Sequence, residues 1–128
     1  MSGSLRPGGF LPGRHGIDAY GNGGFRFGDM SHRGSILMLP SGVHAWEIER
    51  ADAITTSSLA AVLAEREAIE LLLVGTGADI VFLPEPLRQR LKAAGIGLDA
   101  MQTGAAARTY NILAAENRKV AAALIAVP

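Results

Sequence analysis

The feature that most constrains the fold is a change in sequence pattern near residue 50. Eleven of the 16 glycines lie at or before Gly42, as do four of the seven aromatic residues. Frequent glycines between short apolar runs are typical of strands separated by tight turns. After residue 50, helical spacing of apolar residues alternates with unbroken apolar runs, which indicates helices and buried strands. The sequence therefore predicts an N-terminal antiparallel β layer followed by an α/β half.

The first half contains a clear hairpin pattern. Ile17–Tyr20 and Phe25–Phe27 flank Gly21-Asn22-Gly23-Gly24, whose residues readily adopt the positive φ of tight turns. Residues 34–39 and 43–48 predict two further strands, joined by a Pro-Ser-Gly turn. In the second of these strands Val43 and Ala45 share one face, while Trp46 and Ile48 share the other. We expect Trp46 in the core, with an interface as the alternative.

The second half predicts three helices and three strands. The uninterrupted run near the C-terminus is expected of a central strand covered on both faces, and the alternation of strands with helices favours a mixed or parallel sheet. Residues 79–83 fit either a short strand or an extended crossing. The expected helices begin after Thr55–Ser58, at Pro84 and at Thr103, and the expected strands are Ile69–Val74, Ile96–Met101 and Val120–Val127.

The composition is that of one globular domain. Hydrophobic residues make up 48% of the 128 residues and charged residues 19%, which is enough apolar content for a substantial core. Residues 1–14 are rich in glycine, proline and serine and predict a flexible arm. The globular domain is expected to cover residues 15–128, without an internal repeat or linker.

Charge and cysteine content argue against several functional classes. Twelve basic residues balance 12 acidic ones, so the chain lacks the positive field that nucleic-acid binding normally needs. The absence of cysteine excludes disulfides and thiolate chemistry. The apolar runs at Leu71–Val74 and Val120–Val127 are too short to span a bilayer. We therefore predict neither a nucleic-acid partner nor a membrane span.

A glycine-containing loop after a buried strand is the most site-like local feature. Gly75-Thr76-Gly77 follows an apolar run, and glycines in that position let the backbone approach an anion. The dinucleotide pattern is incomplete, because Ile80 stands where the third glycine would fall. The loop is interpreted either as a tight structural turn or as part of a ligand site.

The start of the last helix is the second candidate. Thr103 is expected to cap this helix, Arg108 lies about one turn further on, and Asn111 follows on a neighbouring turn. Since both segments follow strands that end at the same edge of a sheet, they are candidates for one crevice holding a small anion. The alternative is a purely structural role for these residues. In that case Thr103 caps the helix, Arg108 pairs with a surface carboxylate, and the Asn111 side chain forms a hydrogen bond with the backbone.

No catalytic or metal-binding pattern is present. His15, His32 and His44 lack the spacing of metal ligands. Ser31, Ser35 and Ser41 lie in no G-x-S-x-G nucleophile elbow, although a triad formed only in space stays open. We predict no catalytic residue, no metal and no cofactor.

Most of the chain resembles a family of small domains of unknown function. The family includes mitochondrial complex I assembly factor three and the adipogenesis-associated protein. The likeness extends from about residue 17 to residue 126 and is most specific in Thr103–Asn111, with its Thr-x-Ala-Ala-x-Arg-Thr-Tyr-Asn pattern. The other stretches that carry it are 71–77, 83–88, 95–96, 113–118 and 120–124.

This resemblance implies a three-layer β+α/β/α fold around a mixed central sheet. It also implies a non-enzymatic accessory role, with respiratory complex subunits as protein partners and assembly of complex I as the specific task. The location would be the cytoplasm in a bacterium and the mitochondrial matrix in a eukaryote; a homodimer is also open. The rival hypothesis is a protein or enzyme that binds a small anion or nucleotide between Gly75–Gly77 and Thr103–Arg108.

Overall fold

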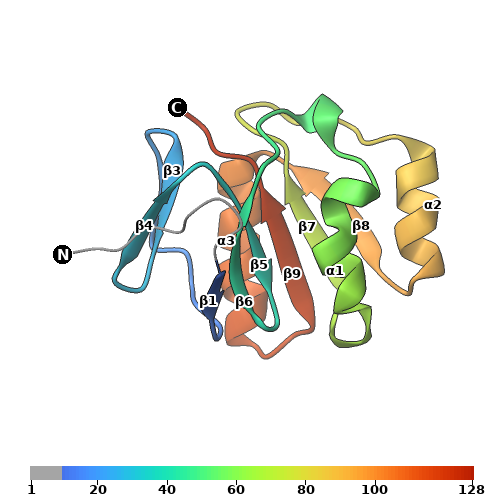
Figure 1. The fold of residues 1–128 in the computed structure, drawn as a ribbon, viewed down its shortest axis with the longest axis horizontal. Helices are drawn as coiled ribbons and strands as arrows, with labels where there is room; N and C mark the ends of the chain where they lie inside the picture. The colour runs from blue at the N-terminus through green and yellow to red at the C-terminus, as the bar shows by residue number, and fades with distance from the viewer. Residues whose placement is uncertain (1–9) are drawn as a thin grey trace.

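The computed structural model describes residues 10–128 and divides their strands between two sheets (Figure 1). The larger sheet has the order β1-β6-β5-β9-β7-β8, and the smaller one the order β2-β3-β4. The strands of the larger sheet are β1 (Phe10–Pro12), β5 (Ser35–Leu39), β6 (Gly42–Trp46), β7 (Leu71–Gly75), β8 (Gly97–Met101) and β9 (Val120–Leu124). The smaller sheet contains β2 (Ala19–Gly21), β3 (Gly24–Phe27) and β4 (Met30–Arg33).

The helices are few and short. The α-helices are α1 (Ala60–Ala64), α2 (Glu85–Ala93) and α3 (Thr103–Ala115), and the 3-10 turns are η1 (Ala51–Ala53), η2 (Ser57–Leu59) and η3 (Arg66–Ala68). Helix α2 ends where Gly95 adopts a φ of 84°, a left-handed conformation that glycine tolerates well. Helix α3 stops two residues before Asn117, which has a φ of 59°. The predicted helices are therefore present, with small shifts at their ends.

The larger sheet is mixed, as predicted. Strand β9 lies between β5, to which it is antiparallel, and β7, to which it is parallel. All five residues of β9 are buried, and they alternate between the two faces of the sheet because successive side chains of a strand point in opposite directions. The apolar run at residues 120–124 therefore forms a central strand covered on both faces.

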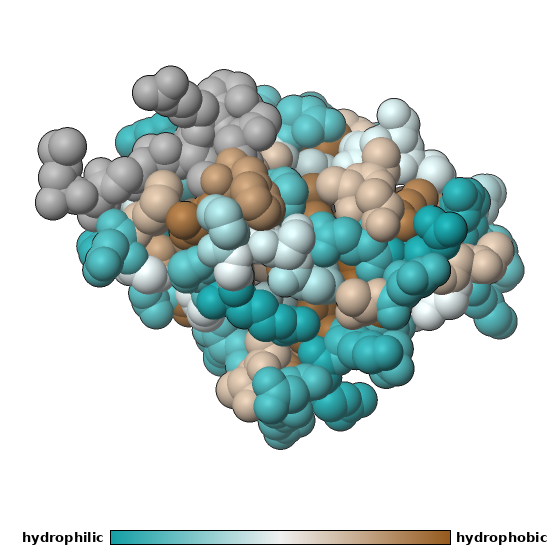
Figure 2. All heavy atoms as spheres, turned by 60° about the horizontal axis from the view of Figure 1, so that its bottom comes forward, coloured by the Kyte–Doolittle hydropathy of each residue, from teal (hydrophilic) through white to brown (hydrophobic). Residues whose placement is uncertain are grey.

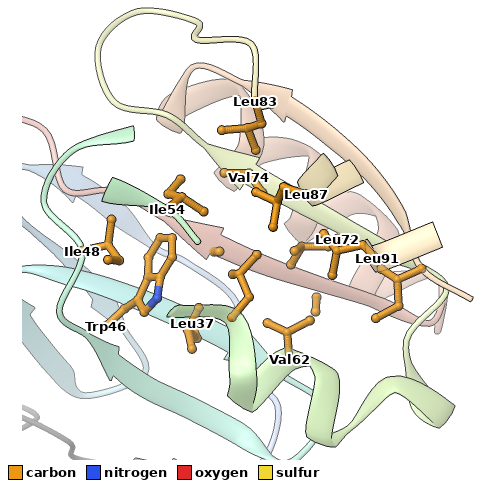
Figure 3. Packing of buried hydrophobic residues seen from close by; sticks show 14 of the residues in the cluster. Leu37, Trp46, Ile48, Ile54, Val62, Leu72, Val74, Leu83, Leu87 and Leu91 are labelled. Carbon is orange, nitrogen blue, oxygen red and sulfur yellow. The ribbon is translucent and has the colours of Figure 1, made fainter. Parts of the chain in front are cut away.

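Two hydrophobic clusters pack against the opposite faces of this sheet. The first contains Trp46, Leu72 and Leu91 and lies under α1 and α2 (Figure 3). The second contains Phe27 and Tyr110, so it joins the smaller sheet and α3 to the other face. This arrangement confirms the three-layer β+α/β/α fold. It also places Trp46 in the core, where its Nε1 donates to the Ser58 carbonyl at 2.8 Å.

The predicted N-terminal β layer is divided rather than continuous. The hairpin is confirmed as β2 and β3, but it pairs with β4, which the sequence did not predict, while β5 and β6 join the larger sheet. The chain changes sheet at Gly34, whose φ of 105° is in the left-handed region. A single glycine thus redirects the chain between two sheets.

The segment predicted as an arm is described only in part. Residues 1–9 lie outside the described residues. Residues 10–12 form β1, which pairs with the free edge of β6 in antiparallel register. Three residues are too few to show strand periodicity, so this edge strand left no signal in the sequence.

Candidate functional site

The Gly75–Gly77 loop and the start of α3 form a bonded joint at the carboxyl ends of β7 and β8. The Thr103 N–H donates to the Gly77 carbonyl at 2.9 Å, and the Gly77 N–H donates to Thr103 Oγ1 at 3.0 Å. The same hydroxyl donates to the Ile125 carbonyl at 2.7 Å. The two predicted segments are therefore adjacent, but here they satisfy one another's polar groups.

Thr103 has a different role from the one predicted. The N-cap of α3 is Gln102, which makes no side-chain capping bond, and Thr103 is the first residue inside the helix. The expectation that Thr103 caps the helix is wrong, because its fully buried hydroxyl bonds Gly77 and Ile125 instead. Thr103 therefore attaches the start of α3 to the Gly75–Gly77 loop and to Ile125, the residue that follows β9.

Thr76 organises the loop that follows β7. Its hydroxyl donates to the Asp79 carbonyl at 2.7 Å, and it also accepts the Val81 N–H at 3.1 Å. Its backbone N–H donates to the Met101 carbonyl at 2.9 Å. Thr76 therefore ties the loop to itself and to the end of β8.

Arg108 and Asn111 line a cleft of about 360 Å³ between α3 and the segment that enters β2. Asn111 accepts the Ile17 N–H at Oδ1 and donates from Nδ2 to the Ile17 carbonyl, both at 2.8 Å. Within residues 10–128, the exposed Arg108 guanidinium has neither a hydrogen bond nor an ion pair. The remaining lining residues are Ile17, Asp18, Ala19, Tyr20, Gly104 and Ala107.

The predicted site residues thus separate into two groups. Gly75, Thr76, Gly77 and Thr103 form the buried joint, whereas Arg108 and Asn111 line the cleft together with Asp18 and Tyr20. The sequence did not predict Tyr20, which also lines the cleft. One signal for it was Gly104 near the helix start, because a Cβ at that position would overlap the Tyr20 hydroxyl group.

A serine, a histidine and a carboxylate meet at the β5–β6 turn. Ser41 Oγ donates to Glu65 Oε2 at 2.6 Å, the Ser41 N–H donates to Glu65 Oε1 at 2.9 Å, and His44 Nε2 lies 3.3 Å from Ser41 Oγ. His44 also contacts the Phe10 ring, with 4.5 Å between the ring centroids.

The order of these contacts is not that of a catalytic triad. In a triad the histidine accepts the serine proton and the acid orients the histidine. Here the serine proton points to Glu65, so His44 Nε2 has to be the donor in its contact with the serine oxygen. The cluster therefore ties the β5–β6 turn to the end of α1, and His44 does not accept the serine proton in this arrangement.

Burial lowers the pKa of His44 below its ordinary value of 6.5, and the Glu65 carboxylate opposes this change. As the pH falls through about 6.5, the unfolded chain takes up this proton before the folded chain does, so the free energy of unfolding decreases. We expect His44→Asn to lose less stability than the wild type between about pH 7.5 and about pH 5.5, as measured by urea unfolding. An identical pH dependence in the two proteins would contradict this role of His44.

The described part of the chain contains neither a cluster of metal-ligating side chains nor a helix suited to span a membrane. No group of three or more histidines, aspartates or glutamates is placed to hold a metal ion among residues 10–128. None of the helices described there is both long enough and apolar enough to span a bilayer.

Comparison with known proteins decides the family. A family model described as a protein of unknown function (DUF498/DUF598) matches residues 17–125. The chain belongs to the DUF498 family. This confirms the resemblance seen in the sequence, including the kinship with complex I assembly factors described next.

Relatives of the DUF498 chain come from bacteria and animals. An uncharacterized protein of Rhodobacter capsulatus is 40% identical over 112 residues, which cover 88% of this chain and 85% of that protein. Proteins named NADH dehydrogenase [ubiquinone] 1 alpha subcomplex assembly factor 3 are 32% identical in Danio rerio and 31% in Homo sapiens. Each of these two matches covers 88% of this chain, but only 64% and 61% of the respective assembly factors.

Solved structures share the fold. A structure described as an outer membrane protein from Bartonella henselae is 52% identical, with a TM-score of 0.88 over 92% of this chain and 99% of that one. The Rpa2829 protein from Rhodopseudomonas palustris is 53% identical, with a TM-score of 0.79 over 88% of this chain and 83% of that one. A structure described as MT938 is only 18% identical, with a TM-score of 0.61 over 89% of this chain and 99% of that one, so it supports the fold alone.

Proposed function

We propose that this DUF498 domain is a non-enzymatic accessory protein that binds a protein partner during assembly of respiratory complex I. The proposal is supported by the 31–32% identity to proteins named as assembly factor 3 of that complex. Because the chain spans less than two thirds of those relatives, their role is carried to it by this proposal only. It places the protein in the cytoplasm of a bacterium, or in the matrix if its source is mitochondrial.

One surface feature carries the proposal. The loop between β7 and α2, along the top of Figure 1, exposes three consecutive apolar side chains: Ile80 at 49%, Val81 at 40% and Phe82 at 80%. Contiguous exposed apolar groups on a small domain are typical of protein interfaces. By contrast, Figure 2 shows a face on which hydrophilic side chains predominate and apolar atoms lie in small separate groups.

The loop is held in shape before any partner arrives. Thr76 bonds the Asp79 carbonyl just before the apolar tripeptide and the Val81 N–H within it, and Leu83 just after the tripeptide is buried. A preorganised loop loses little conformational entropy on binding, so more of its contact energy appears as affinity. Asp79 and Glu85 flank the apolar residues and are exposed, which favours a partner whose apolar pocket has a basic rim.

The test compares two exposed apolar residues on different surfaces. In a bacterial strain lacking the gene, we expect less assembled complex I, and a Phe82→Ser protein should fail to restore the wild-type level. Ile112→Ser is the matched control, since Ile112 is 59% exposed on α3, away from the loop, and it should restore assembly fully. Assembled complex I would be measured on native gels, with protein levels confirmed by immunoblot.

Two outcomes would overturn the proposal. Normal amounts of complex I in the deleted strain would remove the assembly role. Full restoration by Phe82→Ser would show that the apolar loop does not carry the interaction.

The cleft beside α3 supports a second candidate function. An unpaired Arg108 on the wall of a hollow of about 360 Å³ is suited to a small anionic ligand. The Gly75–Gly77 loop would then support the start of α3 rather than touch the ligand. Anion binding that is lost in Arg108→Gln would favour this function.

A further inference from the structure

The outward face of the smaller sheet carries two arginines on neighbouring strands. In the pairing of β3 with β4, Arg26 is opposite Ser31 and Gly24 is opposite Arg33. Because side chains alternate along a strand, these four residues share one face, while Phe25 and Phe27 point into the core on the other. Arg26 and Arg33 are therefore diagonal neighbours, a position in which Cβ atoms are typically somewhat less than about 7–8 Å apart.

Small residues occupy the sheet face between the two arginines. On β2, Gly21 is opposite Gly24 of β3, and Ala19 is opposite Arg26 of β3. A side chain at Gly24 is sterically excluded, because its Cβ would overlap the His32 carbonyl oxygen. The result is a hollow of about 370 Å³ over β2, β3 and β4, lined by residues that include Arg26, Ser31 and Arg33. This volume lies within the range of roughly 300–1,000 Å³ typical of small-molecule sites.

Within residues 10–128, no carboxylate side chain forms an ion pair with Arg26 or Arg33. Arg26 and Arg33 are exposed, and within residues 10–128 the one ion pair is Arg50–Asp52. Residues 1–9 contain no acidic residue, and none of the residues lining the hollow is acidic. Like charges close together on one sheet face are destabilising. Two guanidinium groups that form no ion pair in the described part of the chain thus lie beside one hollow, an arrangement suited to a bound anion.

We propose that this hollow over β2, β3 and β4, between Arg26 and Arg33, is a binding site for a phosphoryl group. A phosphate dianion balances both guanidinium charges, whereas a single carboxylate balances only one. Guanidinium groups bind phosphate oxygens through pairs of parallel N–H bonds. The Ser31 hydroxyl, which has no partner within the described residues, adds a donor between them. The site is separate from the apolar loop and does not depend on the proposed assembly role.

The site can be tested by NMR titration of the full chain with inorganic phosphate, with sodium chloride adjusted to hold ionic strength constant. We expect saturable amide shifts that centre on Gly21, Gly24 and Ser31. Arg26→Gln and Arg33→Gln should each weaken binding by about tenfold or more, since each removes one charge-assisted pair of bonds. Arg90→Gln is the matched control, because Arg90 is exposed on α2, and it should bind phosphate like the wild type.

The outcomes separate this site from its alternatives. Shifts that do not saturate, or equal weakening in Arg90→Gln, would mean general ion screening and would overturn the proposal. Loss of binding in Arg108→Gln, with Arg26→Gln unaffected, would move the anion to the cleft beside α3 and would also overturn it. Sedimentation with phosphatidylcholine vesicles, with and without phosphatidic acid, distinguishes the two sources of the phosphoryl group. Binding only to the phosphatidic acid vesicles assigns the site to a lipid headgroup, and binding to free phosphate alone assigns it to a soluble phosphate ester.

Discussion

Thr103→Val is expected to lower the free energy of unfolding by about 2–6 kcal/mol. Valine has nearly the shape of threonine, so the packing is retained while both hydrogen bonds of the hydroxyl are lost. The Gly77 N–H and the Ile125 carbonyl are then left buried without these partners, and each unsatisfied group costs about 1–3 kcal/mol. Urea unfolding followed by circular dichroism measures the effect.

Two variants act as controls for this experiment. Thr103→Ser keeps the hydroxyl and should lose only the packing of one methyl group, about 1 kcal/mol. Thr109→Val removes a hydroxyl from the same helix whose contact is Met101 Sδ at 3.9 Å, and it should be nearly neutral. Equal stability of Thr103→Val and Thr109→Val would contradict a stabilising role for the hydrogen bonds from the Thr103 hydroxyl to Gly77 and Ile125.

Gly75→Ala is expected to lower the free energy of unfolding by about 1–3 kcal/mol, the usual cost of overfilling a packed core. The added Cβ would lie 2.9 Å from Thr103 Cα, 2.9 Å from Thr103 Oγ1 and 3.0 Å from Leu124 Cδ2. Since Thr103 Cα belongs to the helix backbone, relief requires α3 to move away from the sheet. Urea unfolding again gives the measurement.

Gly97→Ala tests whether this loss is due to crowding. Gly97 begins the neighbouring strand β8, and its added Cβ would meet atoms only at 3.6 Å and 3.8 Å, which is ordinary contact. We expect a neutral effect or a gain of about 0.4–1 kcal/mol from reduced freedom of the unfolded chain. A destabilisation as large as that of Gly75→Ala would show that glycine flexibility, rather than space, matters at both positions.

Most of the larger sheet could be predicted from the sequence. Val120–Leu124 is an unbroken apolar run, which only a strand covered on both faces accommodates, and the structure places it in the centre. The alternation in residues 43–48 assigned Val43 and Trp46 to opposite faces, and they belong to different clusters. Local periodicity was sufficient in these cases because burial acts on each residue separately.

Features that depend on distant partners could not be predicted in this way. Nothing in the sequence distinguishes Gly34 from the other glycines, although the chain passes from one sheet to the other at this residue. Thr103 looked like a helix cap, since local spacing does not show that Gly77 and Ile125 compete for its hydroxyl. The pairing of Arg26 with Ser31, which creates the hollow, depends on β4, a strand of only four residues.

The central position of β9 has a consequence for how the domain is made on the ribosome. Both neighbours of β9, namely β5 and β7, are synthesised before it, so each presents an unpaired edge until residue 124 has emerged. Contacts between residues far apart in sequence form slowly, and exposed strand edges favour aggregation. The nascent domain therefore keeps both edges exposed until β9 has been made, and β9 joins the two halves of the sheet when it inserts between them.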